Sequence, residues 1–267
     1  IRMKSQKILI TGGSRGLGKE LVVQFLDQDC EVHVVGRNSN SEIKSPKLKF
    51  HILDLFNSYE VVDFAKTFIT SHGVPDLLIN NAGSGAFFEW DSFPINQIEK
   101  QINLLFLSPV LMCRVFAPQM ASQQKGKIVN ITSLATIYPL PFMPLYNSTK
   151  SALSSFTHSM QIEYHSIPSF IDVILGDVKT EFNDKLTRTT SDGWSKRAKS
   201  TWIKVEKQLN ESPAPNLVAK RLILKISKCN GGVIYEGGFI HRNIYSFLSR
   251  FLSNSLKNKI LQKRYFN

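Results

Sequence analysis

KILITGGSRGLGKELVVQFL, residues 7–26, contains the features that decide the fold. A short apolar run typical of a buried strand is followed by a glycine-rich loop and then by an amphipathic helical pattern. The loop glycines Gly12, Gly16 and Gly18 have the spacing G-x-x-x-G-x-G. This spacing permits a tight turn, close approach of the backbone to a pyrophosphate, and a helix N-terminus directed at anionic oxygens. We therefore predict a dinucleotide-binding unit at the start of the chain.

The rest of the chain repeats this alternation of strand and helix. The runs EVHVV, KFHIL, DLLIN, KIVNI and FIDVIL are short, rich in β-branched residues and bounded by Gly, Asn, Asp or Ser. Helical patterns lie between them, the longest across residues 97–119. The alternation predicts an α/β fold, with a single doubly wound, Rossmann-type parallel sheet of about seven strands and helices on both faces. In such sheets the loops at the carboxyl ends of the strands carry the function.

The end of the second strand bears on the choice of cofactor. An NAD site would place an acidic side chain there to bind the adenosine ribose, but this chain has Arg37. Together with Arg15 in the glycine loop, it could bind the additional ribose phosphate of NADP(H). We therefore predict NADP(H) as the cofactor. The alternative is that both arginines are solvated surface groups.

A tyrosine and a lysine stand four residues apart in YNSTK, residues 146–150. On a helix this spacing places Tyr146 and Lys150 on one face, where the ammonium would lower the pKa of the phenol and help it to transfer a proton. A chain with many lysines can also produce this short pattern by chance. The pair therefore needs support from other motifs.

Further motifs resemble the short-chain dehydrogenase/reductase family over nearly the whole chain up to about residue 240. NNAG follows the fourth predicted strand, Ser133 precedes Tyr146 by thirteen residues, and LGDVKT follows the sixth strand. Leu175 stands where the family usually has proline, which could loosen the backbone beside the nicotinamide. The resemblance implies a catalytic set of four residues: Asn103, Ser133, Tyr146 and Lys150. The glycine motif and the resemblance together predict these cofactor-binding residues: Gly12, Ser14, Arg15, Gly16, Leu17, Gly18, Arg37, Asp54, Asn81, Ala82, Gly83, Tyr146, Lys150, Gly176, Val178 and Thr180.

The resemblance implies an NADPH-dependent reductase that transfers a hydride to a ketone carbonyl, and that can run in reverse as an alcohol dehydrogenase. Residues 134–145, LATIYPLPFMPL, are strongly apolar and favour a hydrophobic substrate such as a 3-oxoacyl thioester, a 3-ketosphingoid base, a steroid or a polyketide-like ketone. The predicted substrate pocket comprises Ile137, Phe142, Met143 and Phe182, the last in a variable lid over about residues 177–211. The alternative for the apolar loop is ordinary packing. The alternative function is a catalytically inactive, NADP(H)-sensing binding protein.

The positive charge of the chain is concentrated near its end. Residues 1–187 contain 17 Lys and Arg against 17 Asp and Glu, whereas residues 188–267 contain 16 against 4. We predict one domain over residues 1–240 and a basic amphipathic helical extension of it over residues 241–267. This extension could contact an anionic membrane or an acidic carrier protein, close over the pocket, or pack on its own domain or on a dimer partner.

Several other classes of protein are disfavoured. The three cysteines suggest neither disulfides nor a zinc site, and the six histidines show no metal-ligand spacing, so we expect no metal. No nucleic-acid-binding module is recognisable. Without a long uninterrupted apolar run or a cleavable signal, we expect a cytoplasmic protein, with a membrane surface as the alternative location. By resemblance we expect a homo-oligomer.

Overall fold

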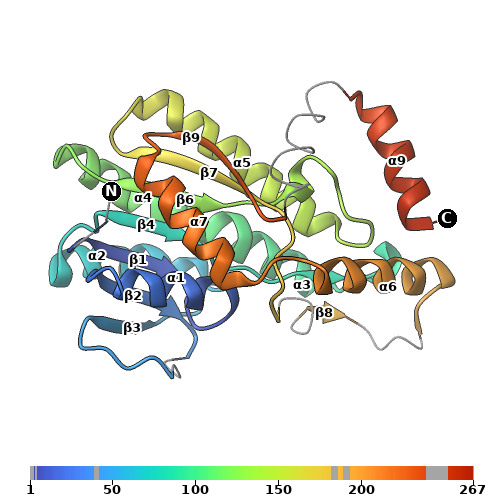
Figure 1. Cartoon of the computed structure of the whole chain (residues 1–267), viewed down its shortest axis with the longest axis horizontal. Helices are drawn as coiled ribbons and strands as arrows, with labels where there is room; N and C mark the ends of the chain where they lie inside the picture. The colour runs from blue at the N-terminus through green and yellow to red at the C-terminus, as the bar shows by residue number, and fades with distance from the viewer. Residues whose placement is uncertain are drawn as a thin grey trace.

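The computed structural model describes residues 3, 5–38, 42–181, 186–188, 193–238 and 252–266. Seven parallel strands form one sheet in the order β3-β2-β1-β4-β6-β7-β9 (Figure 1). This order confirms the predicted doubly wound sheet, because the chain first builds outward from β1 to β3 and then returns to continue from β4 in the opposite direction.

The strands of the large sheet are short, and a two-stranded sheet of β5 and β8 lies apart from it. The strand bounds are β1 Lys7–Thr11, β2 Glu31–Gly36, β3 Leu48–Ile52, β4 Leu77–Asn80, β5 Ala86–Phe87, β6 Lys127–Ile131, β7 Ser169–Leu175, β8 Thr187–Arg188 and β9 Gly232–Glu236. The helix bounds are α1 Gly16–Leu26, α2 Ser58–His72, α3 Ile95–Ile102, α4 Ser108–Ser122, α5 Pro144–Tyr164, α6 Lys196–Asn210, α7 Pro215–Lys228 and α9 Asn254–Phe266. Short helical turns are η1 Trp90–Ser92, the π-helical η2 Asn103–Leu107, and η3 Leu134–Thr136.

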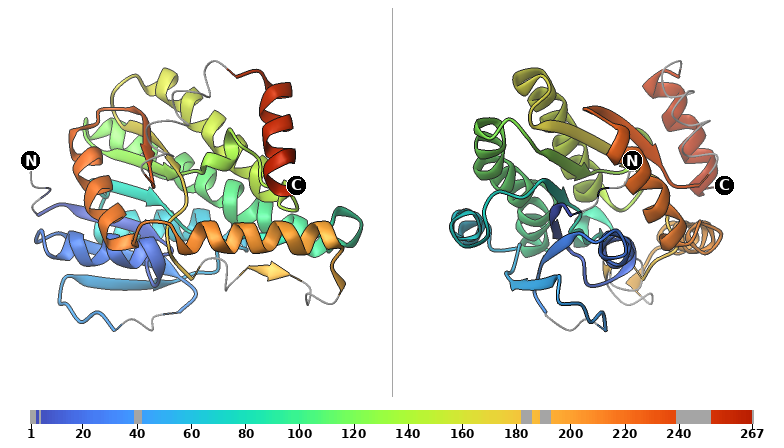
Figure 2. Two further views of the ribbon diagram at one scale, coloured as in Figure 1. Left: turned by 45° about the vertical axis from the view of Figure 1, so that its right-hand side comes forward. Right: turned by 60° about the vertical axis from the view of Figure 1, so that its left-hand side comes forward.

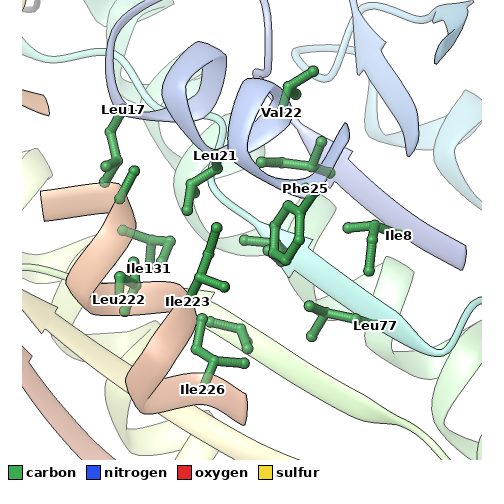
Figure 3. Packing of buried hydrophobic residues seen from close by; sticks show 14 of the residues in the cluster. Ile8, Leu17, Leu21, Val22, Phe25, Leu77, Ile131, Leu222, Ile223 and Ile226 are labelled. Carbon is green, nitrogen blue, oxygen red and sulfur yellow. The ribbon is translucent and has the colours of Figure 1, made fainter. Parts of the chain in front are cut away.

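Helices cover both faces of the sheet, as predicted (Figures 1 and 2). Helices α1 and α7 pack on one face, while α2, α4 and α5 contribute to the core on the other. Figure 3 shows Leu21 and Phe25 of α1 meeting Leu222 and Ile226 of α7 over the strands. All four are fully buried. Burial of each side chain of this size contributes about 1.5–3 kcal/mol, so this layer holds the glycine loop at the start of α1 firmly against β1.

The helical pattern at residues 97–119 corresponds to one longer helical stretch, which contains α3, η2 and α4. Within the described residues this stretch, 95–122, is the one helix long and apolar enough to cross a membrane by length and composition. Half of its most apolar window is buried inside the protein, where Met112 and Phe116 pack against the sheet. Its apolar character therefore has a structural explanation in the core.

Two helices lie beyond the strands, at the right of Figure 1. The end of α9 lies beside α6, and Lys204 of α6 donates a hydrogen bond of 3.0 Å from Nζ to the backbone oxygen of Arg264. The predicted C-terminal helix is thus present, and it contacts its own domain. The start of the predicted extension, residues 241–251, lies outside the described residues, and with it the apolar residues Ile244, Phe247, Leu248 and Phe251.

Candidate active site

A cavity of about 480 Å³ lies at the carboxyl ends of the strands. Loops after β1, β2, β3, β4, β6 and β7 line it, and α6 and α9 form its outer wall. Every predicted cofactor-binding residue lines this cavity. The sheet therefore brings predicted cofactor-binding residues up to 168 positions apart, from Gly12 to Thr180, to one concave surface.

The glycine loop is held tightly by the segment after β4. Gly12 has a φ of +71°, and a Cβ on it would lie 2.7 Å from the Cα of Ala82. The Asn81 side chain donates from Nδ2 to the backbone oxygens of Thr11 and Gly12, each at 3.0 Å. The Thr11 hydroxyl accepts hydrogen bonds of 3.0 Å from the backbone N–H groups of Asn81 and Ala82. These bonds explain why NNAG and the glycine loop occur together.

The loop and its surroundings fit a dinucleotide. The backbone at Gly12 has no room for a side chain, and Gly16 opens α1 with its N-terminus at the cavity. Such a helix end favours anionic oxygens. Arg15 and Arg37 both line the cavity, and the Arg37 guanidinium lies 5.5 Å from the centre of the Phe56 ring. Two cations at this end would favour an additional phosphate.

Ser133 and Tyr146 meet inside the cavity. Ser133 follows β6, and its Oγ accepts a 3.1 Å hydrogen bond from the Ala135 backbone N–H. Tyr146 projects from the first turn of α5, and its hydroxyl is hydrogen-bonded to Ser133. Tyr146 is half-buried and lines the cavity, and desolvation of its phenol raises the pKa of Tyr146 above its usual value, against the effect of the Ser133 hydrogen bond. The Asp177 carboxylate adds to the increase.

Lys150 lies one turn further along α5 and is almost completely buried. Its Nζ donates a 2.6 Å hydrogen bond to the backbone oxygen of Ile131, at the end of β6. Burial lowers the pKa of Lys150 to about 8, although the Asp172 carboxylate acts in the opposite direction. The sequence interpretation, in which Lys150 lowers the pKa of Tyr146, therefore needs correction. Burial controls the pKa of the phenol, and the ammonium is engaged by Ile131.

A buried carboxylate that the sequence motifs did not identify holds the segments that carry Ser133 and Lys150. Asp172 on β7 is fully buried, and its two carboxylate oxygens accept hydrogen bonds of 2.5 Å from the hydroxyls of Thr132 and Ser154. Its Oδ2 also lies 3.3 Å from His158 Nε2. Asp172 thereby connects β7 to the residue before Ser133 and to the helix that carries Lys150. The available sequence signal was a single charged residue, Asp172, within the apolar run FIDVIL.

Asn103 occupies a different place from the other three predicted catalytic residues. It begins the π-helical turn η2, and its Nδ2 donates a 3.0 Å hydrogen bond to the backbone oxygen of Phe56. Asn103 is not among the residues that line the cavity. Its side chain ties the helix to the loop after β3, since the widened turn directs the amide toward that loop.

The predicted substrate residues divide into three outcomes. Met143 lines the cavity, but Ile137 and Phe142 do not. The Phe142 ring instead packs 5.3 Å from that of Phe87 and 6.3 Å from that of Phe266, and the Phe142 backbone has a φ of +63°. Phe182 lies outside the described residues. The apolar loop thus partly lines the cavity and partly packs against neighbouring aromatic rings.

The outer wall contains polar residues that no sequence motif assigned to the site, two of them in the C-terminal extension that was predicted as able to close over the pocket. Gln208 of α6 donates a hydrogen bond to Asp177 and accepts one from Arg264 of α9. This chain of three side chains joins the loop after β7, α6 and α9 at the cavity. Lys257 of α9 adds a cation 6.0 Å from the centre of the Tyr138 ring. No local motif marks these residues, since they meet only after the C-terminal helix has folded back.

Comparisons with known proteins agree with this geometry. A family model for short chain dehydrogenases matches residues 6–191. The chain is 32% identical over 185 residues to a 3-ketodihydrosphingosine reductase of Bacteroides thetaiotaomicron, covering 68% of this chain and 67% of that protein. It is 27% identical over 233 residues to a very-long-chain 3-oxoacyl-CoA reductase of Bos taurus, covering 79% of this chain and 72% of that protein.

The fold also matches a solved structure over its full length. A short-chain dehydrogenase from Streptomyces avermitilis superimposes with a TM-score of 0.81 at 17% identity, covering 99% of this chain and 100% of the other. The family match, the similar reductases and the common sheet support one conclusion. The chain belongs to the short-chain dehydrogenase family and is an oxidoreductase that acts on CH–OH and C=O groups.

Proposed function

We propose that this protein is an NADPH-dependent reductase of long-chain 3-oxo lipids, such as 3-ketosphingoid bases or 3-oxoacyl thioesters. The observation that carries the proposal is the Ser133–Tyr146 hydrogen bond, which lies in the same cavity as the glycine loop and faces a largely apolar outer wall. The similar proteins include reductases named for the substrates 3-ketodihydrosphingosine and very-long-chain 3-oxoacyl-CoA. Both substrates join a ketone to a long hydrocarbon chain.

The protein's own residues would supply the proton and the binding of the carbonyl oxygen. A bound NADPH supplies the hydride. At neutral pH the raised pKa of Tyr146 keeps its phenol protonated, which is the state required of a proton donor to the developing alkoxide. Ser133 is placed to donate a second hydrogen bond to the same oxygen. At a pH below its pKa of about 8, most Lys150 side chains are protonated. The ammonium can then orient the cofactor ribose next to Tyr146.

The preference for NADPH rests on the two arginines. Arg15 and Arg37 both line the cavity, and Arg37 stands directly after β2, where an NAD site would have a carboxylate for the unphosphorylated ribose. A phosphate would gain charge-assisted hydrogen bonds there, each contributing about 1.5–3 kcal/mol. We therefore propose a higher kcat/KM for NADPH than for NADH.

The substrate class is proposed from the apolar residues that line the cavity. Apolar side chains converge on it from the loop after β6, from α6 and from α9. Those that line the cavity are Leu134, Leu140, Met143, Val205, Leu209, Leu252, Ile260 and Leu261. Lys257 and Arg264 lie among them and would suit an anionic or carbonyl-rich head group beside the hydrocarbon chain.

Oxidation of NADPH in the presence of long-chain 3-oxo substrates, with NADH in a parallel series, tests the proposal. We expect Tyr146→Phe to lose about 10²–10⁴-fold in kcat while still binding NADPH. Tyr59→Phe is a matched control, because the Tyr59 side chain is 90% exposed. If Tyr146→Phe retains turnover within about tenfold of wild type, the assignment of the proton donor fails. NADPH binding by the wild type with no turnover of any ketone would favour the cofactor-sensing alternative.

We further propose that the surface formed by α6 and α9 contacts anionic lipid. Ile203 and Leu256 are 65% and 46% exposed, and the same helices carry many of the lysines of the basic C-terminal part. Apolar side chains surrounded by cations favour an anionic bilayer surface. Sedimentation with phosphatidylserine vesicles should decrease when salt is raised from about 0.05 to 0.5 M, because screening weakens the attraction. Sedimentation that is absent at both salt concentrations would contradict this part of the proposal.

A further inference from the structure

Three histidines from separate elements meet on the face of the sheet covered by α2. His33 lies on β2, His51 on β3, and His72 is the last residue of α2. A ring nitrogen from each lies within 4.8 Å of those from the other two. Since β2 is separated from β6 by β1 and β4, this cluster lies about 14 Å across the sheet from the strand that leads to Ser133. The reductase mechanism uses none of these residues.

Hydrogen bonds define the tautomer of the central ring. His33 Nε2 lies 3.0 Å from Glu31 Oε1, and a carboxylate can only accept, so Nε2 carries the hydrogen. In the neutral ring, His33 Nδ1 is then an acceptor, and it lies 2.8 Å from Nε2 of His51. A histidine that donates one ring N–H to a carboxylate and directs its other nitrogen toward further imidazoles has the arrangement typical of a metal ligand.

Surrounding contacts hold the three rings in place. Phe68 of α2 packs against each of them, with ring-centre distances of 4.9 Å to His33, 5.5 Å to His51 and 5.2 Å to His72. His33 is fully buried, while His51 and His72 are half-buried. The cluster thus has a closed aromatic side and a side that solvent can reach, which leaves a path for an ion.

The nitrogen positions are close to those that a tetrahedral ion requires. Bonds of about 2.0–2.1 Å to a central ion separate two tetrahedral ligand nitrogens by about 3.3 Å. The His33 and His51 nitrogens, now 2.8 Å apart, would need to separate by about half an ångström, and the hydrogen on His51 Nε2 would move to its Nδ1. His72, at the end of a helix, would move inward.

We propose that His33, His51 and His72 bind one divalent transition-metal ion of the Zn²⁺ or Co²⁺ class, with a solvent-facing fourth position. Three imidazoles favour this class, since Mg²⁺ and Ca²⁺ prefer oxygen ligands. The ion would join β2, β3 and α2, and so fix the strand that leads to Arg37 against the neighbouring strand and helix. The competing explanation is a hydrogen-bonded imidazole cluster with no affinity for metal.

The experiment uses the full-length chain without a histidine tag, after dialysis against a chelator. Titration with CoCl₂ is followed by the visible absorption of four-coordinate Co²⁺, and ZnCl₂ then competes for the site. We expect one ion per chain in the wild type, a loss of affinity of more than about 100-fold in His72→Gln, and a loss of about 10–100-fold in Glu31→Gln. His165→Asn is the matched control, because His165 is exposed at the end of α5 and lies outside the cluster.

Circular dichroism confirms that each variant is folded, and His51→Gln replaces His72→Gln if the latter is not. Saturable binding that is lost in the cluster variant and kept in His165→Asn supports the proposal. Three results overturn it: no saturable Co²⁺ binding by the wild type, equal binding by wild type and cluster variant, or an equal loss in His165→Asn.

Discussion

Replacement of Lys150 by methionine should expose the cost of keeping this lysine buried. Its pKa is lowered from 10.5 to about 8, mainly by burial. Because the folded pKa lies below the unfolded one, the unfolded chain binds more protons between these values, and the free energy of unfolding rises with pH there. Below pH 8 the folded protein carries the full penalty for a buried ammonium, which amounts to about 3 kcal/mol.

The penalty falls to about 1.4 kcal/mol at pH 9.5, where the folded lysine is mostly neutral and the unfolded one is still mostly charged. Lys150→Met removes this titration. It also leaves the Ile131 carbonyl without its 2.6 Å donor, but that cost of about 1–3 kcal/mol does not depend on pH. The wild type should therefore gain about 2 kcal/mol of stability relative to Lys150→Met between pH 7 and pH 9.5.

Urea unfolding of both proteins at the two pH values measures this difference, and thermal unfolding should show a relative shift of about 4 °C for a chain of this size. Lys66→Met, which replaces an exposed lysine on α2, serves as the control. A difference between wild type and Lys150→Met that stays constant within about 0.5 kcal/mol from pH 7 to pH 9.5 would refute the reasoning. It would mean that Lys150 remains fully solvated or fully paired in the folded protein.

The remaining predictions concern the cofactor loop, the cofactor preference and the buried carboxylate. Gly18→Ala would place a Cβ 2.1 Å from a carbonyl oxygen of the same loop. We therefore expect a loss of about 1–3 kcal/mol in stability and much weaker NADPH binding by fluorescence titration. Gly193→Ala, whose Cβ meets nothing within 4 Å, is the control and should bind NADPH normally. Arg37→Ala should raise the KM for NADPH by about 10–100-fold and leave the KM for NADH nearly unchanged, and equal effects on both would contradict a phosphate-binding role. Asp172→Asn should lower the pKa of Lys150 below about 8, because the Asp172 carboxylate raises that pKa. The alkaline limb of the kcat/KM profile should then move to lower pH. A limb that does not move would show that Lys150 does not control the alkaline limb.

Local chemistry made much of the geometry of the candidate active site predictable from sequence. The glycine spacing needs a backbone without Cβ atoms at one turn, and Asn81 is required there because its amide bonds the carbonyls of that same turn. The order of apolar runs and helical periods likewise determined the parallel sheet and the edge at which its loops gather. Such features are local in the chain, so residue type and spacing are enough to identify them.

Only the tertiary structure decided the environment of each group. Lys150 and Tyr146 have the spacing of a pair on one helix face, yet packing against β6 engages the ammonium with Ile131 and leaves burial to set the pKa of the phenol. The wall formed by α6 and α9 depends on a helix that returns to the sheet from the end of the chain. In the same way, His33 and His72 are 39 positions apart in the sequence, and only the pairing of β2 with β3 beneath α2 brings them together. Sequence spacing determines which groups share a turn, whereas burial and contacts between distant segments determine what those groups can do.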